Sequence, residues 1–411
     1  MENCNIDQFK TQLSSNKDKV VLFGAGNVGE IALYSCNQLG IPVDFFCDNN
    51  KKKQDSKFLG VETISPEELK KLGNNVNIFV SNNNALSVSS QLKKEGFKKI
   101  YNCTNLFKKT DFSNPTNIKT QAASSVKIKR KVEFYDSMCL KNSYESTGTL
   151  HIKSLDVQVT ERCSLKCKNC CNLMQYYERP VNAEFDLLFL SLDRFVAAVD
   201  KIDEFRVLGG DPFMNKEMYK AVNKLKEYDK VDKIVIYTNA KIIPKGENLN
   251  CLKHNKVVLD ISNYGGELAS KHPEILKVLK DNNVTYSYST FDTWSDSGRI
   301  TPFQNRTEGE NKRVFSECCN RDTLSVLHGI LYRCPFQANA HNLKAIPENK
   351  SDYVNLADDK VPLNTLKKEI KKLAYHKDYL TACLYCNGRD YTVPDIKAAE
   401  QTKRPLSYKR I

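Results

Sequence analysis

From residue 153 onward, short apolar runs alternate with longer amphipathic stretches. The short runs predict buried strands, and the stretches between them have the apolar spacing of helices. Strands that alternate with helices form right-handed crossovers, so this order predicts one parallel sheet covered by helices. The predicted strands are 155–159, 205–208, 233–237, 257–261 and 284–288, and the predicted helices are 185–202, 216–228 and 267–281.

Residues 1–106 repeat this rhythm on a smaller scale and predict a Rossmann-like module. Its glycines Gly24, Gly26 and Gly29 stand between a predicted strand and a helix, and Asp48 follows the next strand. In such a turn the helix N-terminus binds phosphate and the acid binds ribose. We therefore predict these four residues as contacts for a nucleotide or nucleotide-sugar. The alternative is a module that binds no ligand and serves assembly or partner recognition. The predicted strands are 20–23, 41–47, 77–80 and 99–101, with helices after Gly29, from Pro66 and over 85–95.

The polar segment 107–149 predicts a linker that contains one helix at about 132–142. A chain of 411 residues is long enough for two or three domains. No stretch has the apolar length of a membrane span, and the N-terminus lacks a secretory signal pattern. Fifteen cysteines in such a chain favour metal ligation in the reducing cytoplasm over disulfides.

The net charge of +13 would suit a nucleic-acid-binding protein. The lysines, however, are interspersed with Glu and Asp along predicted helices, which is typical of a solvated surface. We therefore do not predict nucleic acid as the partner. A basic surface would also suit an anionic small molecule.

Three cysteines occupy one short loop directly after the predicted strand 155–159. Cys163, Cys167 and Cys170 have the spacing C-x3-C-x2-C and can converge on one metal centre. Zinc sites and four-iron clusters normally take four protein ligands, so a set of three favours a cluster with one open iron. The alternative is a zinc knuckle with a fourth ligand elsewhere, for which Cys171 is a candidate. Cys171 is adjacent to Cys170 and is interpreted as a buried neighbour.

A glycine-rich loop with the sequence Gly209-Gly210-Asp211-Pro212 follows the next predicted strand. Together with the cysteine loop it resembles the radical S-adenosylmethionine (SAM) superfamily. The resemblance implies a partial (β/α)6 barrel over residues 150–310. It also implies a [4Fe–4S] cluster on the three cysteines, whose fourth iron binds SAM for cleavage to a 5′-deoxyadenosyl radical. In the same resemblance Gly209, Gly210, Asp211 and Pro212 are implied as SAM contacts. The sequence departs from the family pattern at Asp211, where Glu is commoner, and at Asn169, where an aromatic residue is usual.

Polar residues follow two further predicted strands. Because the carboxyl ends of parallel strands collect ligands, we predict Thr238, Asn239, Ser262 and Asn263 as a group of SAM or substrate contacts. Each residue alone could equally serve a turn. Beyond the last strand, Trp294 and Arg299 share a loop and could stack on and pair with a substrate, with ordinary packing as the alternative for the Trp.

A second set of cysteines follows, comprising Cys319, Cys334, Cys383 and Cys386. The segment 323–333 predicts a hairpin that turns at residues 328–329 and presents Cys334. The segment 311–411 resembles the twitch or shortened SPASM extension of radical SAM enzymes, which implies one fully ligated auxiliary [4Fe–4S] cluster. Cys318 is the alternative to Cys319, and a structural zinc site is the alternative to the cluster.

The resemblances together imply an oxygen-sensitive radical SAM oxidoreductase in which the auxiliary cluster accepts an electron. The N-terminal module favours a sugar or nucleotide-sugar substrate, and a flavodoxin or ferredoxin would supply electrons. A peptide- or protein-modifying radical SAM enzyme is the alternative within the family. A zinc-bound interaction protein with a nucleotide-sensing head is the alternative outside it. The sequence does not identify the general base.

Overall fold

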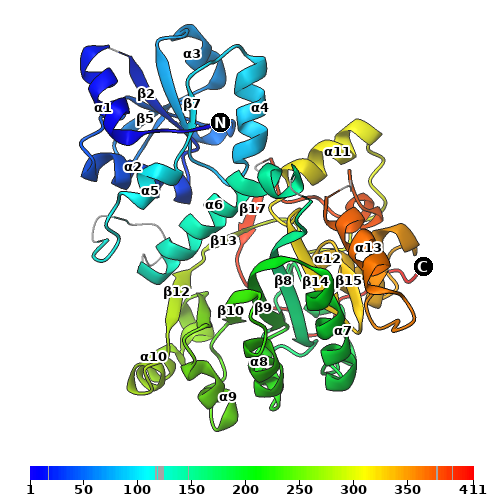
Figure 1. The fold of residues 1–411 in the computed structure, drawn as a ribbon. Coiled ribbons are helices and arrows are strands. Elements are labelled where there is room, and N and C mark those ends of the chain that lie inside the picture. The colour runs from blue at the N-terminus through cyan, green and yellow to red at the C-terminus, as the bar shows by residue number, and fades with distance from the viewer. Residues whose placement is uncertain (17, 116–117, 119–124, 147, 376–377, 391) are drawn as a thin grey trace. The chain divides into compact units, whose positions relative to one another are not determined.

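The computed structural model describes residues 1–16, 18–115, 118, 125–146, 148–375, 378–390 and 392–411. The chain forms two compact units, residues 1–143 and 144–411. Figure 1 shows the course of the chain, and each unit is described by itself. Within the described residues, no helix has both the length and the apolar character needed to cross a membrane.

The first unit contains a seven-stranded sheet in the described part of the chain, with the order β1-β7-β6-β2-β3-β5-β4. All neighbouring strands pair in parallel except β4 and β5. The order of the strands reverses between β2 and β6, as it does in doubly wound nucleotide-binding folds. This confirms the predicted Rossmann-like sheet. The strands are β1 (Glu2–Asn3), β2 (Lys19–Phe23), β3 (Phe45–Cys47), β4 (Ser56–Phe58), β5 (Val61–Ile64), β6 (Val76–Val80) and β7 (Ile100–Asn102).

The helices of this unit follow the predicted order. The helix after the glycine turn is α2, and its buried residues include Val28 and Ile31, which pack into the same apolar cluster as the central strand β2. The strand predicted at 41–47 is shorter than expected, because only Phe45–Cys47 pair with β2 and β5. The helices are α1 (Ile6–Ser15), α2 (Asn27–Gln38), α3 (Pro66–Lys71), α4 (Ala85–Lys94) and α5 (Thr104–Lys108).

The predicted linker contains a long helix, α6 (Ser125–Ser146), where the sequence indicated a shorter one. Ile128 and Tyr135 of this helix are buried in the core of the first unit, and Val132 packs against that core. Their spacing of three and four residues places them on one helix face. This apolar stripe was concealed by the many charged residues around it. Residues 116–117, 119–124 and 147 of the predicted linker lie outside the described residues.

The second unit contains an eight-stranded sheet, again within the described residues, with the order β12-β11-β10-β9-β8-β14-β15-β16. Neighbouring strands from β12 to β14 pair in parallel, and the last two pairs are antiparallel. The predicted parallel α/β core is thereby confirmed, and the sheet is open, not a closed barrel. The strands are β8 (His151–Thr160), β9 (Lys201–Gly209), β10 (Val231–Thr238), β11 (Val257–Asn263), β12 (Tyr286–Thr290), β14 (Thr323–Leu327), β15 (Ile330–Tyr332) and β16 (Tyr353–Asn355).

The predicted hairpin is present and pairs β14 with β15. His328 and Gly329 have φ values of +47° and +81°, as a tight two-residue hairpin turn requires. The hairpin belongs to the main sheet, because β14 pairs in parallel with β8. A short antiparallel pair, β13 (Thr293–Ser295) with β17 (Asp395–Lys397), lies outside this sheet.

The two faces of the main sheet have different chemistry because successive side chains in a strand alternate. Leu155, Val157 and Val159 of β8 pack in the large apolar core with helical residues such as Leu192. Helix α7 ends at Ala198, before the predicted residue 202, because β9 begins at Lys201. The helices of this unit are α7 (Phe185–Ala198), α8 (Met218–Lys226), α9 (Glu247–Asn250), α10 (His272–Asp281), α11 (Glu308–Glu317), α12 (Pro335–Asn342) and α13 (Leu363–Tyr375).

The packing of α6 makes a testable prediction. The Tyr135 ring is fully buried, and its hydroxyl accepts a hydrogen bond from the Cys103 N–H and donates one to the Val80 carbonyl. We expect Tyr135→Ala to lower the free energy of unfolding of the first unit by about 3–5 kcal/mol, because it removes a buried aromatic ring. Faster amide hydrogen exchange in β2 and β6, measured by mass spectrometry on the full chain, would report the loss. Leu140→Ala is the control, since Leu140 lies on the same helix and is 46% exposed. Equal exchange in the two variants would contradict a structural role for α6.

Candidate active site

The cysteine loop follows β8 and faces a cavity of about 360 Å³. Cys163, Cys167 and Cys170 all line this cavity, so the structure brings the three predicted ligands together. Burial raises the pKa of Cys163 to about 12 and that of Cys167 to about 11, and it raises the pKa of Cys170 well above its usual value. Buried thiols of this kind become thiolates only beside a cation, which fits the irons of a cluster.

The spacing of the sulfurs bears on the type of metal centre. No three His, Cys, Asp or Glu side chains in the described part of the chain lie close enough together to hold one metal ion. In a four-iron cluster each cysteine binds a different iron, so its ligands stand further apart than those of one ion. Three cysteines on one loop match three of the four irons of such a cluster.

Two glycines hold the cysteine loop against the end of β9. The Gly210 N–H donates to the Thr160 carbonyl at 2.9 Å, and the Asp211 N–H donates to the Arg162 carbonyl at 2.9 Å. A Cβ on Gly209 would overlap the Thr160 carbonyl, and one on Gly210 would overlap the Arg162 carbonyl. Both glycines also line the cavity. Their small size is required by the approach of one backbone to the other, before any ligand binds.

Asp211 is placed differently from the predicted SAM contact. Its carboxylate is buried and accepts hydrogen bonds from the Thr238 hydroxyl at 2.8 Å, the Asn239 N–H at 3.0 Å and the Phe213 N–H at 3.1 Å. Burial raises its pKa, and these hydrogen bonds oppose the rise. Neither Asp211 nor Pro212 is among the described residues that line the cavity. Asp211 therefore braces the ends of β9 and β10.

The other predicted polar contacts divide into two groups. Thr238, Asn239 and Ser262 line the cavity, and the Asn239 amide nitrogen lies 3.6 Å from the Cys163 sulfur. Asn263 does not line it. The Asn263 side chain donates to the Thr290 hydroxyl at 3.1 Å and accepts from the Gly265 N–H at 2.8 Å. Asn263 thus serves the turn after β11, which was the alternative for each of these residues.

Sequence patterns alone did not identify a segment near the C-terminus that pairs with the cysteine loop. The Lys168 N–H donates to the Glu400 carbonyl at 2.6 Å, and the Thr402 N–H donates to the Lys166 carbonyl at 2.8 Å. The Gln401 side chain donates to the Cys167 sulfur at 3.2 Å. Gln401 also accepts from the Lys166 N–H at 2.8 Å. This segment holds the middle of the loop, whereas the glycines hold its start, and no local sequence pattern marks it.

A buried ion pair lies on the sheet face that lines the cavity. The Arg206 Nε donates to the Asp156 carboxylate at 2.6 Å, and the two residues are register partners on β8 and β9. Burial raises the pKa of Asp156, and Arg206 opposes this rise. Tyr237 of β10 lines the same cavity. The signal for this group was the alternation of polar and apolar residues in the first predicted strand.

Aromatic side chains form part of the cavity wall. Tyr264 and Trp294 both line it, and their rings meet edge to face with centroids 5.4 Å apart. Trp294 lies on β13 and also packs with Cys167 and Leu165 of the cysteine loop. Arg299, predicted to pair with a substrate alongside this Trp, is not among the described residues that line the cavity.

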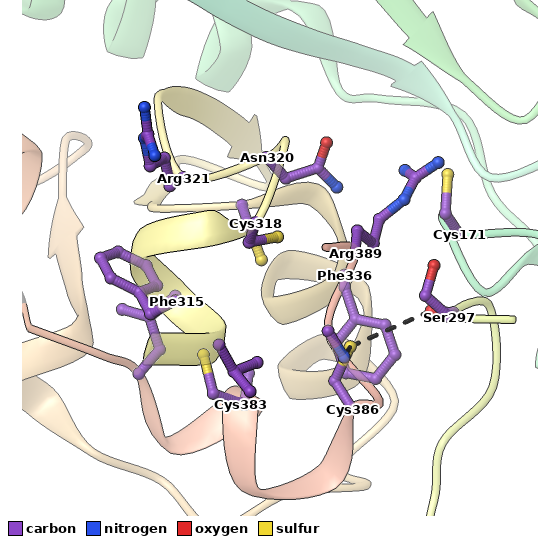
Figure 2. Close-up of a pocket in the computed structure, with 15 residues that line it drawn as sticks. Cys171, Ser297, Phe315, Cys318, Asn320, Arg321, Phe336, Cys383, Cys386 and Arg389 are labelled. Atoms are coloured by element: carbon purple, nitrogen blue, oxygen red, sulfur yellow. Dashed lines mark hydrogen bonds between the residues drawn. The ribbon is translucent and has the colours of Figure 1, made fainter. Parts of the chain in front are cut away.

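A second cavity is lined by five cysteines, namely Cys171 and the set of Cys318, Cys334, Cys383 and Cys386. Figure 2 draws the residues that line it. Burial raises the pKa of Cys318 and of Cys383 to about 12, and the neighbouring sulfurs contribute to the rise. Cys334 caps the N-terminus of α12, where its sulfur accepts the Gln337 N–H at 3.3 Å. The Cys386 sulfur accepts the Gly388 N–H at 3.3 Å. Four partly buried cysteines fit the ligand number of a complete cluster.

The structure favours Cys318 over the predicted Cys319 in this set. Cys319 is exposed, and it is absent from the described lining of the cavity. Cys318 caps the C-terminal end of α11, so its side chain and that of the next residue point in different directions. We therefore assign Cys318, the alternative from the sequence, to the candidate set in place of Cys319.

The two cysteine-lined cavities share part of their walls. Cys171, Ser297, Asn320 and Arg389 line both of them. In Figure 2, Cys386 contacts Ser297, whose carbonyl is 4.0 Å from the Cys386 sulfur. Cys171 thus lies between the cavities, beside the first set of cysteines.

In the first unit, the predicted glycine turn lies at the point where the strand order reverses. Gly24 has a φ of +126°, and a Cβ on Gly29 would overlap the Gly24 carbonyl. A Cβ on Gly26 would lie 3.9 Å from the Lys53 amine, which is ordinary contact. Asp48 accepts hydrogen bonds from the Ala25 N–H at 2.9 Å and the Asn50 N–H at 2.9 Å, and it pairs with Lys53 at 3.3 Å. A ribose hydroxyl would share the carboxylate with these three donors.

Two family matches correspond to the two units. Residues 16–100 match a family described as C2185-like, N-terminal. Residues 156–275 match the 4Fe-4S single cluster domain. The second match spans β8 to β11 and includes the three-cysteine loop and the glycine loop. Over this segment the chain is similar to radical SAM enzymes. The matched family is described by one 4Fe-4S cluster, which fits the three-cysteine loop.

Curated relatives match a short part of the chain. The GTP 3′,8-cyclase of Clostridium acetobutylicum is 30% identical over 95 residues, which is 23% of this chain and 30% of the relative. The GTP 3′,8-cyclase of Ectopseudomonas mendocina is 29% identical over 89 residues, covering 21% of this chain and 26% of the relative. The chain therefore spans less than a third of the length of these relatives.

Solved structures give a weaker likeness. BtrN in complex with AdoMet and 2-DOIA has 16% identity and a TM-score of 0.38, covering 62% of this chain and 98% of BtrN. Native anSMEcpe with bound AdoMet has 12% identity and a TM-score of 0.37, covering 54% of this chain and 83% of that one. TM-scores below 0.5 establish no shared activity.

The packing of the cysteine loop makes a second prediction. We expect Gly210→Ala to displace the loop, because a Cβ would overlap the Arg162 carbonyl. The anaerobically reconstituted protein should then lose about four irons per chain, which is one [4Fe–4S] cluster. Gly309→Ala is the control, since a Cβ there meets no atom within 4 Å. Full iron content in Gly210→Ala would show that the loop tolerates the shift.

Proposed function

We propose that this radical SAM enzyme is an oxidoreductase that acts on a sugar or nucleotide-sugar. The observation that supports oxidation is the shared wall between the two cysteine-lined cavities, formed by Cys171, Ser297, Asn320 and Arg389. A two-electron oxidation must remove a hydrogen atom, a proton and one further electron from the substrate. An electron acceptor next to the site of hydrogen removal would meet that need.

The first cavity would hold the SAM-binding cluster on Cys163, Cys167 and Cys170. When bound, the two cofactors and an auxiliary cluster would supply hydrogen-atom abstraction and a one-electron acceptor. Asn239 and Gln401 would orient two of the thiolates, because their amides donate toward the Cys163 and Cys167 sulfurs. The aromatic wall of Tyr264 and Trp294 would exclude water from the reacting radical. A one-electron donor such as flavodoxin or ferredoxin would start the reaction.

The second cavity would hold the auxiliary [4Fe–4S] cluster on Cys318, Cys334, Cys383 and Cys386. The turn that carries the last two is braced by Arg306, which donates to the Cys383 carbonyl at 3.0 Å and to the Cys386 carbonyl at 3.1 Å. A rigid turn keeps the two sulfurs at fixed positions for a cluster.

The substrate class rests on the first unit. Its doubly wound order and the glycine turn at the reversal point support a nucleotide or nucleotide-sugar ligand. Such a ligand should raise the melting temperature of the full chain as its concentration rises, because it binds the folded state alone. A panel of nucleoside diphosphates and nucleotide-sugars would test this. No shift with any of them would remove the support for a nucleotide-linked substrate.

Metal analysis tests the proposed function directly. After anaerobic reconstitution we expect about eight irons and eight sulfides per chain, since two [4Fe–4S] clusters contain that number. With SAM and dithionite the protein should form 5′-deoxyadenosine, measured by liquid chromatography. Cys163→Ala should abolish this product and leave about four irons on the second set. Zinc without sulfide, and no SAM cleavage, would contradict the enzyme and support the zinc-bound interaction protein.

The adjacent cysteines allow a matched test of the second set. We expect Cys318→Ala to lose about four irons per chain and Cys319→Ala to retain them, because only the Cys318 thiol lines the second cavity. Electron paramagnetic resonance of the reduced proteins should show one fewer cluster signal in Cys318→Ala alone. The reverse result would assign the ligand to Cys319.

A further inference from the structure

Arg389 is a buried cation on the wall that the two cavities share. It follows the C-x2-C pair and lines both cavities together with Asn320 and Ser297. Its Nε–H is buried and has no hydrogen-bond partner among the described residues. A guanidinium stays charged in proteins, so it cannot relieve this cost by losing its proton. The position therefore requires negative charge from another source.

The side chains around the first cavity do not supply that charge. Asp156 is the one carboxylate among the described residues that line it. This carboxylate already pairs with Arg206 at 2.6 Å. In Figure 2 the Arg389 side chain extends toward Cys171, at the junction of the cavities. The free donor thus lies beside the space where a substrate would meet the first cluster.

The positive charge of Arg389 could instead neutralise the auxiliary cluster. The backbone N–H groups of Gln337 and Gly388 already donate to the Cys334 and Cys386 sulfurs. Arg389 also lines the larger cavity, which the auxiliary cluster does not fill. The auxiliary cluster alone does not explain why Arg389 also lines the larger cavity, whereas an anion bound in that cavity does.

We propose that Arg389 binds an anionic group of the substrate, a carboxylate or a phosphate, and that the substrate is an acidic sugar derivative. Guanidinium groups bind both anions through paired N–H donors. Asn320 and Ser297 supply further polar groups at the same wall. Binding there would hold the oxidised C–H bond between the two cysteine sets. This inference rests on the proposed function and adds the charge of the substrate to it.

The test uses the full, reconstituted and SAM-loaded chain with three probes, namely inorganic phosphate, gluconate and glucose. Isothermal titration should show saturable binding of phosphate or gluconate to the wild type, and none of glucose. Arg389→Gln should weaken anion binding at least tenfold, and Arg389→Lys should weaken it less. Arg404→Gln is the control, since Arg404 is exposed. Phosphate alone would indicate a phosphorylated sugar, and gluconate alone a sugar acid.

Iron content and SAM affinity are measured on each variant. The proposal is overturned if the wild type binds neither anion, or if Arg389→Gln and Arg404→Gln bind them equally. A loss of about four irons in Arg389→Gln that Arg389→Lys restores would assign Arg389 to the auxiliary cluster instead. A selective loss of SAM affinity would assign it to the SAM carboxylate. Failure of the proposed function is separate, because it appears as absent clusters and absent 5′-deoxyadenosine in the wild type.

Discussion

The candidate active site depends on the close approach of three backbone segments. The end of β9 lies against the start of the cysteine loop, because Gly209 and Gly210 leave room for the carbonyls of Thr160 and Arg162. At the other end of the loop Gly298 leaves room for the Asn169 carbonyl, which a Cβ would overlap. A loop held at both ends presents its three thiols in one arrangement, which reduces the conformational entropy lost when a cluster binds.

Burial of the thiols explains why such rigid support is needed. Burial makes the thiolate form of these cysteines costly, as the raised pKa values of Cys163, Cys318 and Cys383 show. Iron would supply the positive charge that keeps these thiols ionised. The N–H donors at Gln337 and Gly388 supply partial positive charge at the second set. Cluster binding and local folding are therefore expected to be coupled.

The sequence predicted those features that arise from local patterns. The strand positions, the hairpin turn at His328 and the three-cysteine loop follow from alternation and spacing. Features that arise from tertiary contacts were missed. Gln401 meets Cys167 across 234 residues, and no pattern links them. The choice between Cys318 and Cys319 depends on how α11 ends. The position of Asp211 depends on its hydrogen bonds from Thr238 and Asn239, which lie on and after a different strand.

Some polar residues of the site lie on strands, because one face of the main sheet lines the first cavity. Since β8 and β9 pair in register, Asp156 and Arg206 form an ion pair that is independent of any loop. The apolar residues that alternate with them on β8 and β9 pack on the opposite face of the sheet. A substitution on the face that lines the cavity can therefore change the cavity without removing core contacts. Arg389 differs because it lies on a loop after the C-x2-C pair, where its position depends on the second set of cysteines. Charge recognition at Arg389 and assembly of the second centre are therefore mechanically linked, whereas the Asp156–Arg206 pair is fixed by the sheet alone.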